Sequence, residues 1–562
     1  MKAGKKTAAA CLTAIMFFTG VLLQVSPQSV NAQIRSSTIV PVSGAVFDIR
    51  AFGAKGDGKA LDSPAINRAV DAAAAKGGGT VLLPAGTYRS FSIRLKSNIT
   101  LYFDQGSTLV AASPNDGDGK YDLPEPNAWE KYQDFGHTHW HNSLIWGENL
   151  ENISILGPGL IWGKGLVRSG SQSRTKEQND AIANVKVDKD KAPFGYPNPR
   201  DAVEPRWGNK SISLKLCRNV IIRDVSILHG GHFAVLATGV DNLTIDNLKI
   251  DTNRDGIDID ACRHVRVSNT TVNSPFDDGI CLKSSYGLGF ARATENVTIT
   301  NCEVSGYDEG TLLDGTYKRD YRTSNGTFSP TGRIKFGTES NGGFKNITIS
   351  NCVFDYCRGL ALESVDGALL EDVTITNITM RDIANTPIFI RLGKRNRGPN
   401  ETMVEGKLRR VIISNIVAYN AEPRYASIIS GVPGNDIEDI RLSNIQIYYK
   451  GGGTLEQASL QPPEKETDYP EPTMFGEIPA YGFFIRHVKG ITMSDVEVSY
   501  MKNDVRPPFF LSDVDGADFH RVKAQRAAEG KTFILRDVAD FSTSQVSLVP
   551  DMRIDRVQSK EF

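Results

Sequence analysis

Three aspartates are spaced so that they could carry out acid–base chemistry. Asp255 lies in the segment 252–260, and Asp277 and Asp278 lie together in the segment 274–280. Gathered carboxylates repel one another, and proteins usually compensate for this with a metal ion or with a shared proton and water. The structural alternative is that these aspartates lie in solvated turns and take part in no chemistry. For Asp258 and Asp260, each taken singly, the solvated turn is the preferred interpretation.

A pair of carboxyl groups that flanks a sugar linkage can hydrolyse it. One carboxyl with a raised pKa protonates the leaving oxygen while the other activates water, and inverting enzymes hold the two about 6.5–9.5 Å apart. A diagonal between neighbouring strands reaches that separation. The three aspartates therefore predict hydrolysis of a glycosidic bond.

The elements that position these aspartates are copies of a short repeat. Each copy starts with a polar residue, often Asn or Asp, and continues with β-branched residues that alternate with polar ones. Alternation is typical of half-buried strands, and strands that recur at this interval bury their apolar faces only by stacking. The sequence therefore predicts an all-β chain folded as a right-handed parallel β-helix, with Asn ladders at its corners. A β-propeller would need hairpin signals, which are absent. Copies start at Asn98, Asn152, Asn219, Asn242, His264, Asn296, Asn346, Asp372, Arg410, Asp439, Gly490 and Arg521.

The repeat also predicts how the aspartates align. The step from Asn242 to His264 is 22 residues, and so is the step from Asp255 to Asp277. Equal steps place residues at equal positions on successive coils. We therefore expect Asp277 directly above Asp255, one strand spacing of about 4.8 Å away, with Asp278 beside it.

The ends and the interruptions of the repeat fit the same architecture. A helix that begins near Asp62 has Pro64 in its first turn, and we expect it to cap the N-terminal end of the solenoid. Its apolar stripe is Ile66, Ala69, Val70 and Ala73. Three long polar interruptions predict surface excursions that wall a groove. They are residues 105–145, 163–210 and 451–480.

Residues 1–32 have the three regions of a secretory signal peptide, and we predict that they form one. Lysines at the start precede an apolar stretch from 8 to 25 and small residues at 30–32. A membrane anchor is the alternative, because the apolar stretch is near spanning length. We expect export to the periplasm or the extracellular space, as a monomer with no membrane span and with one catalytic domain over 33–562.

Composition narrows the classes of partner and of cysteine chemistry. The chain has 562 residues and a formal net charge of −1, which argues against a nucleic-acid partner. Removal of Cys11 leaves six cysteines with no CxxC pair and no zinc-type spacing. We expect them to be buried, stacked thiols.

The motif Asn-x-Asp-Gly at 253–256, followed one coil later by Asp-Asp at 277–278, is specific. Together with the opening segment 47–70, it resembles the polygalacturonase family (glycoside hydrolase family 28) over residues 45–450. The resemblance implies a pectin-lyase-like solenoid and hydrolysis of an α-glycosidic bond in a pectic oligo- or polysaccharide. It also implies inversion of configuration, with no cofactor and no metal.

The same resemblance assigns roles within the cluster. Asp277 is expected to be the general acid, and Asp255 and Asp278 are expected to hold and deprotonate the attacking water. Asn253 is expected to orient them.

Two further motifs of that family are altered in this chain. Gly332 stands where the family has a His, although the following turn is kept and ends at Glu339. Ala361 and Glu363 replace the Arg and Lys that would grip a galacturonate carboxylate. These changes favour a neutral or deoxy sugar, such as the rhamnose of rhamnogalacturonan, at the cleavage site.

Other cations could replace the missing pair. Arg333, Lys335 and Lys283 lie at neighbouring positions of the repeat. For all three the structural alternative is a solvated strand edge. Whether these cations bind a substrate carboxylate is left open by the sequence.

Further residues are candidates for sugar contact. His232 is expected one coil before Asp255, and Glu339 and Glu363 are expected along the groove. The acidic segment 306–314 forms either a substrate wall or a plain loop. A second set could contact sugar, pack in the core or, for its histidines, bind a metal. This set is His137, His139, His141, Trp129, Trp140 and Trp207.

Two other functions remain open. In a Ca²⁺-dependent polysaccharide lyase the aspartates would bind the ion and Arg254 would remove a proton. In a carbohydrate-binding β-solenoid the same fold would have no catalysis. The one-sided excursions favour exo over endo action.

Overall fold

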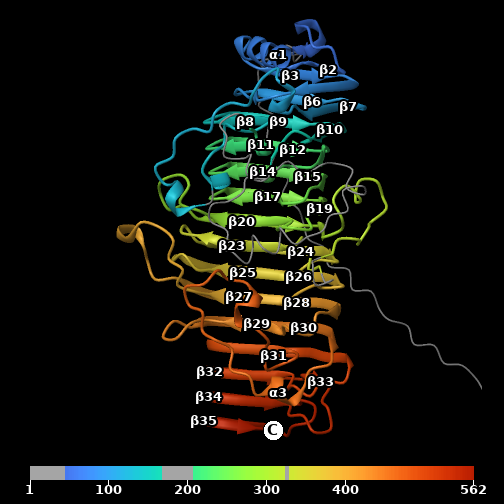
Figure 1. Ribbon diagram of the computed structural model, residues 1–562. Helices are drawn as coiled ribbons and strands as arrows, with labels where there is room; N and C mark the ends of the chain where they lie inside the picture. Colours follow the sequence, from blue (N-terminus) through green and yellow to red (C-terminus); the bar gives the residue numbers. More distant parts are fainter. Residues whose placement is uncertain (1–44, 134, 168–206, 323–327) are drawn as a thin grey trace, which may run out of the picture. The chain divides into compact units, whose positions relative to one another are not determined.

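The computed structural model describes residues 45–133, 135–167, 207–322 and 328–562. Residues 44–562 form one compact unit, in which short strands wind into coils that stack one on the next (Figure 1). The predicted right-handed parallel β-helix is confirmed. The predicted signal peptide and most of the excursion 163–210 fall outside the described ranges. Within these ranges, no helix is both long and apolar enough to span a membrane.

The strands form three parallel stacks. We call the first the covered sheet, because most of its strands are buried on both faces. It consists of β5 (Ile93–Arg94), β8 (Ile145–Glu148), β11 (Lys210–Lys215), β14 (Phe233–Thr238), β17 (Asp255–Asp260), β20 (Ile280–Ser284), β23 (Ile334–Ser340), β25 (Leu360–Ser364), β27 (Ile388–Leu392), β29 (Ser427–Ser430) and the first residues of β31 (Phe483–Lys502).

The other two stacks alternate buried and exposed side chains. The second consists of β1 (Val46–Asp48), β3 (Gly79–Leu83), β6 (Ile99–Phe103), β9 (Glu151–Leu156), β12 (Arg218–Arg223), β15 (Asp241–Asp246), β18 (Arg263–Ser268), β21 (Thr294–Thr300), β24 (Phe344–Asp355), β26 (Leu369–Arg381), β28 (Lys407–Ala421) and β30 (Ile437–Gly451). The third consists of β2 (Asp57–Leu61), β4 (Gly86–Ser90), β7 (Ser107–Ala111), β10 (Leu160–Trp162), β13 (Ser226–Leu228), β16 (Lys249–Asp251), β19 (Thr271–Asn273) and β22 (Glu303–Ser305), and it continues into the later halves of β24 and its successors.

The apolar positions of the repeat line the core, as predicted. Val220, Leu243, Val265 and Val297 align from coil to coil and are all buried. Burial of each such side chain contributes roughly 1.5–3 kcal/mol. The alternation that was visible in the sequence is therefore the pattern of the solenoid interior.

The polar residue that starts each copy sits at a corner of the coil. Asn98, Asn152, Asn219 and Asn242 have left-handed backbone conformations, which Asn tolerates better than most residues. Their side chains form the predicted ladder: each amide donates to the carbonyl oxygen of the Asn one coil before, over 2.8–3.0 Å. Arg521 is an exception, because it aligns with Asp495 at the following corner, which also has a left-handed conformation.

Replacement of Asn219 by Ala is expected to lower the free energy of unfolding by about 1–2 kcal/mol, because Ala is strained at its φ of 56°. Asn219→Gly is the matched control, since it also loses the ladder bonds but tolerates the backbone conformation. Urea titration of both variants measures the difference. Equal stabilities would show that backbone strain does not set the preference at this corner.

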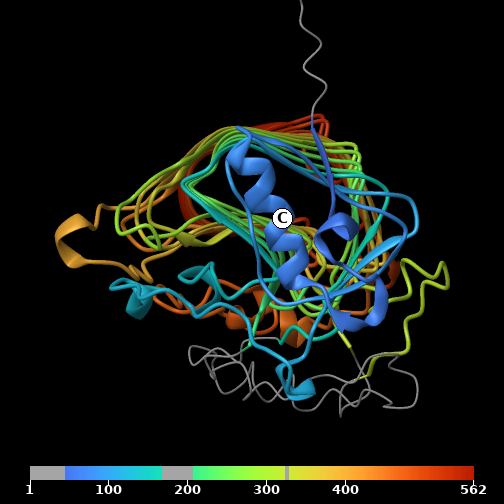
Figure 2. The same cartoon turned by 90° about the horizontal axis from the view of Figure 1, so that it is seen from above.

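Both ends of the described solenoid are covered. Helix α1 (Ser63–Ala75) buries Ile66, Ala69, Val70 and Ala73 over the N-terminal coil, as predicted. In a view along the axis of the solenoid, the helix lies across the stacked coils (Figure 2). The side chain of Asp62 does not cap this helix. It accepts hydrogen bonds from the backbone N–H groups of Lys55 and Gly56 instead.

The opposite end is covered by strands that the sequence did not predict as a cap. After β32 (Phe509–His520), β33 (Lys523–Ala524) and β34 (Phe533–Ser544), the final strand β35 (Met552–Glu561) pairs with β34 in antiparallel orientation. Six free cysteines are buried, as expected. The short 3₁₀ helices η1 (Ile49–Phe52) and η6 (Asn400–Thr402) lie in connections.

Two predicted excursions are described. The first begins later than residue 105, because Ser107–Ala111 form β7. It carries η2 (Pro114–Asp116), η3 (Glu130–Tyr132) and η4 (Phe135–His137). The second, residues 451–480, carries α3 (Leu455–Ala458) and η7 (Pro472–Phe475). We call residues 451–480 the strap.

Candidate functional site

The three aspartates meet at the covered sheet. Asp255 is the first residue of β17, and Asp277 and Asp278 end the turn before β20. One carboxylate oxygen from each lies within 4.8 Å of the others. Asp255 and Asp278 are buried, whereas the side chain of Asp277 is 27% exposed. The cluster is therefore open to solvent at Asp277.

The alignment of these aspartates differs from the predicted one. Asp251 pairs with Asn273, a step of 22 residues, but Ile257 pairs with Ile280, a step of 23. One extra residue is inserted in the turn between β19 and β20. The prediction that Asp277 lies directly above Asp255 was therefore wrong: Asp278 takes that position, and its carbonyl accepts the N–H of Gly256.

The spacing of the carboxylates is short. Their closest oxygens lie within 4.8 Å, which is less than the roughly 6.5–9.5 Å typical of an inverting acid–base pair. A single water that hydrogen-bonds to two oxygens at about 2.8 Å each holds them within about 5 Å. Two of the three carboxylates can thus share one water, and the third is left to act on a sugar.

Arg254 helps to separate the pKa values of two carboxyls in the cluster, those of Asp255 and Asp277. Burial raises the pKa of Asp255 well above its usual range, and Asp277 and Asp258 raise it further. Burial would also raise the pKa of Asp277, but Arg254, Lys335 and Lys283 outweigh it and hold that pKa below its usual range. Arg254 donates a hydrogen bond to Asp277. Of these two carboxyls, Asp255 is therefore the one that takes up a proton more readily.

The cations Arg333 and Lys335 lie on the other side of Asp278. Arg333 Nε donates to Asp278 Oδ1 over 2.8 Å, and Lys335 Nζ lies 3.3 Å from Asp278 Oδ2. Both side chains are buried. The alternative of a solvated strand edge was therefore wrong, because the strap covers this part of the sheet through Tyr469 and Glu471.

Glu363 completes this charged group from β25. Its oxygens lie 3.7 Å from Arg333 Nη2 and 3.5 Å from Lys335 Nζ, and neither accepts a hydrogen bond from the described residues. Burial raises the pKa of Glu363 to about 7, although the two cations oppose the shift. The carboxyl can therefore take up a proton close to neutrality.

Lys283 and Glu339 belong to a neighbouring charged group. The solvated-edge alternative was wrong for Lys283 too, because its side chain is buried. Lys283 Nζ lies 3.2 Å from Glu339 Oε2 and 3.6 Å from Asp258 Oδ2, and His137 Nε2 lies 3.3 Å from the same Asp258 oxygen. Burial would raise the pKa of Glu339, but Lys283, His137 and Arg397 keep it well below its usual range.

Asp258 and Asp260 are fully buried, so the solvated-turn interpretation was wrong for both. Asp260 accepts hydrogen bonds from the backbone N–H and the hydroxyl of Ser285. The reason is that the excursion after β7 covers this face of β17 and brings His137 to Asp258.

Asn253 and His232 lie beside the cluster. Asn253 donates to Glu309 Oε2 over 3.1 Å, and Glu309 Oε1 lies 2.9 Å from His229 Nδ1. The acidic segment 306–314 therefore reaches the site through one buried carboxylate. His232 is buried, and its electrostatic interaction with Asp277 contributes to lowering the pKa of that carboxyl.

The remaining histidines and tryptophans have packing partners. Trp140 and Trp207 are buried, and Trp140 donates to the hydroxyl of Thr238, so core packing holds for both. Trp129 is half-buried, with its ring 5.2 Å from that of Tyr286. His139 pairs with the carboxylate of Glu130, and His141 pairs with that of Glu148 and lies 3.8 Å from that of Glu125.

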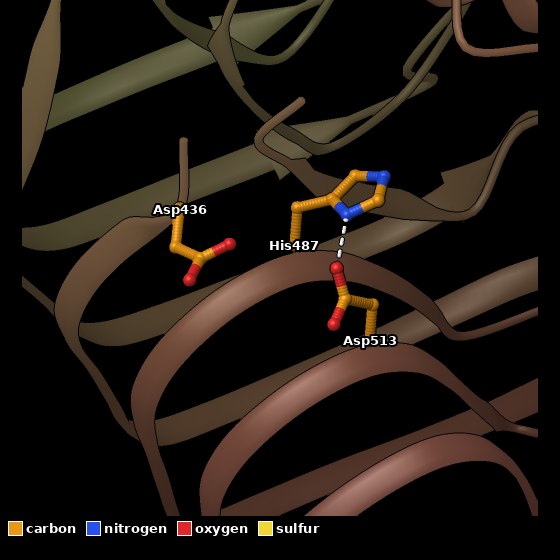
Figure 3. Close-up of side chains that lie close together, drawn as sticks. All are labelled: Asp436, His487 and Asp513. Atoms are coloured by element: carbon orange, nitrogen blue, oxygen red, sulfur yellow. Dashed lines mark hydrogen bonds and ion pairs between the residues drawn. The ribbon is translucent and has the colours of Figure 1, made fainter. Parts of the chain in front are cut away.

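A second cluster fastens the strap. His487 Nδ1 lies 2.7 Å from Asp513, its Nε2 lies 3.0 Å from Glu464 of the strap, and Asp436 lies beside them (Figure 3). Burial raises the pKa of Asp436, and Asp513 raises it further. The imidazole thus joins the strap to the coil of β32.

Three residues of the site were missed or left without a role by the sequence analysis, and a fourth, Arg254, was given a role only in the alternative lyase. Arg254 stands inside the Asn-x-Asp-Gly motif, so its position was visible although its partner was not. Glu309 lies in a segment that had been singled out for its acidity. Tyr469 and Glu471 have no sequence signal, because they reach the cluster from the strap, more than 130 residues after Arg333 and Lys335.

Comparison with known proteins places this geometry in context. Two family models match: "Rhamnogalacturonase A/epimerase, pectate lyase-like" over residues 46–197 and "Right handed beta helix region" over residues 204–328. An exo-poly-α-D-galacturonosidase of Dickeya chrysanthemi is 28% identical over 282 residues, which are 46% of this chain and 44% of that protein. The match thus spans less than half the length of this relative. An exopolygalacturonase of Platanus acerifolia is 22% identical over 74% of this chain and 93% of its own.

Solved structures agree on the fold. The family 28 exopolygalacturonase of Yersinia enterocolitica superposes with a TM-score of 0.59 at 18% identity, over 84% of this chain and 78% of its own. The resemblance to polygalacturonases that the motifs predicted is confirmed at modest identity, and the right-handed β-helix is shared.

Proposed function

We propose that this polygalacturonase-like chain is an exported glycoside hydrolase that cleaves α-glycosidic bonds of a pectic polysaccharide by acid–base catalysis. The observation that carries the proposal is the convergence of Asp255, Asp277 and Asp278 within 4.8 Å, with Asp277 open to solvent. The names of the Dickeya and Platanus relatives support a pectic substrate.

The positions of the carboxyls suit the proposed roles. Asp277, at the exposed rim, is the group that can reach a glycosidic oxygen and protonate it. Asp255 and Asp278, on aligned coils beneath it, hold and deprotonate the water. Direct attack by this water is expected to invert the anomeric centre, as for other acid–base pairs of this type.

The general acid must carry a proton before the bond breaks, whereas Arg254 keeps Asp277 ionised in the free protein. We propose that a substrate group that engages Arg254 releases Asp277. The proton then passes from Asp255 to Asp277, and Asp255 becomes the base. Because the carboxyls share the proton, the pH–rate profile belongs to the cluster rather than to one residue.

Incubation with a panel of galacturonan and rhamnogalacturonan oligosaccharides tests the reaction class. We expect products whose masses show one added water per cut, and proton NMR during the first turnovers should show the inverted anomer. Retention of configuration would reject the water-attack scheme. Absence of cleavage across the panel would favour the carbohydrate-binding solenoid.

A lyase is the second candidate, favoured by one observation. The three aspartate oxygens could hold a metal ion, and Arg254 lies against Asp277. A Ca²⁺-dependent lyase would give unsaturated products that absorb ultraviolet light, and a chelator would abolish its activity. The hydrolase is expected to give neither result.

Export is a proposal based on residues 1–32. Fractionation of an expressing cell, with N-terminal sequencing of the mature chain, is expected to find the protein outside the cytoplasm with its first residue near Gln33.

A further inference from the structure

The strap carries two side chains into the catalytic neighbourhood. Between β30 and β31 it runs along the outside of the coils, and its residues Tyr469 and Glu471 contact the cations that flank Asp278. Tyr469 OH lies 3.3 Å from Lys335 Nζ and 3.2 Å from Thr338 Oγ1. The strap therefore forms part of the site.

Two buried arginines hold the strap in place. Arg391 donates to the carbonyl oxygens of Glu464 and Lys465 over 2.9 and 3.1 Å, and Arg486 donates to those of two prolines, 462 and 463. The ring of Phe475 is buried and lies 5.3 Å from both guanidinium groups. This anchoring fixes the position of the strap before any substrate binds.

Glu471 is held as a bound carboxylate would be. Its Oε1 accepts from Arg333 Nη2 over 2.6 Å, and its Oε2 accepts from Arg358 Nη1 over 2.9 Å. Burial would raise the pKa of Glu471, but Arg333, Arg358 and Lys335 keep it below its usual range. The carboxylate is therefore ionised and uses both of its oxygens on guanidinium groups.

When Glu363 is ionised, the charges around Asp278 are balanced within the chain. Three cations, Arg333, Lys335 and Arg358, meet three carboxylates, Asp278, Glu363 and Glu471. A uronate carboxylate at this place would be a fourth acid for three cations. Like charges that share a buried site without extra cations are strongly disfavoured.

We propose that Glu471 is a specificity-determining residue that occupies, from within the chain, the carboxylate position at Arg333 and Arg358. The sugar unit that lies beside Asp278 toward β23 and β25 is then uncharged. This inference rests on the proposed hydrolase and names the class of sugar at one of its subsites. The inference also bears on Glu363, which stands where the polygalacturonase family has a cation. The strap adds a second carboxylate, that of Glu471, to the cations that Glu363 already faces.

Binding of monosaccharides tests the inference without turnover. The probes are D-galacturonate and, as the neutral match, D-galactose, titrated calorimetrically against the full chain and against Glu471→Ala. We expect the variant to bind galacturonate about tenfold or more tightly than the unaltered chain does, because a charge-assisted carboxylate position becomes vacant. Galactose affinity should not change.

The control is Glu477→Gln, which removes an exposed strap carboxylate that accepts from Gln457 and should leave both affinities unchanged. If Glu471→Ala does not fold, Glu471→Ser is tested instead, because its short side chain also leaves the position vacant, with the same expectation of a gain for galacturonate alone. Equal galacturonate affinity in the unaltered chain and the folded variant would overturn the proposal. Failure of the proposed hydrolase function would be detected in a different experiment, as absence of oligosaccharide cleavage by the unaltered chain.

Discussion

Replacement of Asp277 by Asn is expected to lower kcat on the cleaved pectic oligosaccharide by about 10²–10⁴-fold, the usual contribution of a general acid. The amide keeps the shape of the side chain and cannot deliver a proton to the leaving oxygen. Steady-state rates on the oligosaccharide identified by the panel measure the effect, with KM expected to change much less than kcat.

Asp255→Asn is expected to lower the rate over the same range and to affect stability differently. Burial and two neighbouring carboxylates raise the pKa of Asp255 above the value of an unfolded Asp, so the folded chain binds more protons than the unfolded chain. Stability is then lost as pH rises from about 4 through that raised pKa. An uncharged Asn removes this loss, so the variant should unfold at the same or a higher urea concentration at neutral pH.

Asp246→Asn is the matched control for both substitutions. Asp246 ends β15, outside the cluster, where it accepts hydrogen bonds from Ser268 and Asn269. Its rate should stay near that of the unaltered chain. A near-normal rate for folded Asp277→Asn or Asp255→Asn would contradict the roles proposed for these two residues.

The fold was predictable because its signal is local and repeated. Alternation from Asn219 and from Asn242 marks strands whose inward positions align in the structure, and the Asn at each start occupies the left-handed corner. The register at the site was not predictable from the same spacing. A single residue added in the turn before β20 changes no alternation, yet it moves Asp278 rather than Asp277 into alignment with Asp255.

The clustering of the acidic residues in the candidate site was predictable from the sequence, whereas the burial of the residues around them was less so. The gathering of Asp255, Asp277 and Asp278 follows from the repeat. The burial of Arg333 and Asp258 does not, because it depends on excursions whose paths are not periodic. The sequence therefore suggested a solvated strand edge at Arg333 and a solvated turn at Asp258, whereas the strap and the excursion after β7 exclude water from them.

Arg333→Met is expected to lower the free energy of unfolding by about 3–5 kcal/mol at neutral pH, because removal of one partner from a buried ionic group leaves the others uncompensated. Arg333 contacts Asp278, Glu363 and Glu471, and it is almost fully buried. Arg319→Met is the control, since that partly exposed arginine pairs with Asp355 and Asp382 and should cost roughly 0–1 kcal/mol.

The pH dependence of the stability deficit of Arg333→Met distinguishes uncompensated carboxylates from a simple loss of packing. Glu363 already has a pKa of about 7 in the folded chain, against 4.5 for an ordinary Glu, and loss of Arg333 removes a cation that holds that pKa down. The folded variant therefore keeps this proton to a higher pH than the folded unaltered chain does, so its stability deficit grows as pH rises above about 7. Urea titrations should show the deficit shrinking from about pH 9 toward about pH 7 and then levelling off, because below that pH the carboxyl is protonated in both folded chains. A deficit that is independent of pH would mean that Arg333 stabilises the fold by packing, and that the carboxylates around it are compensated by other groups.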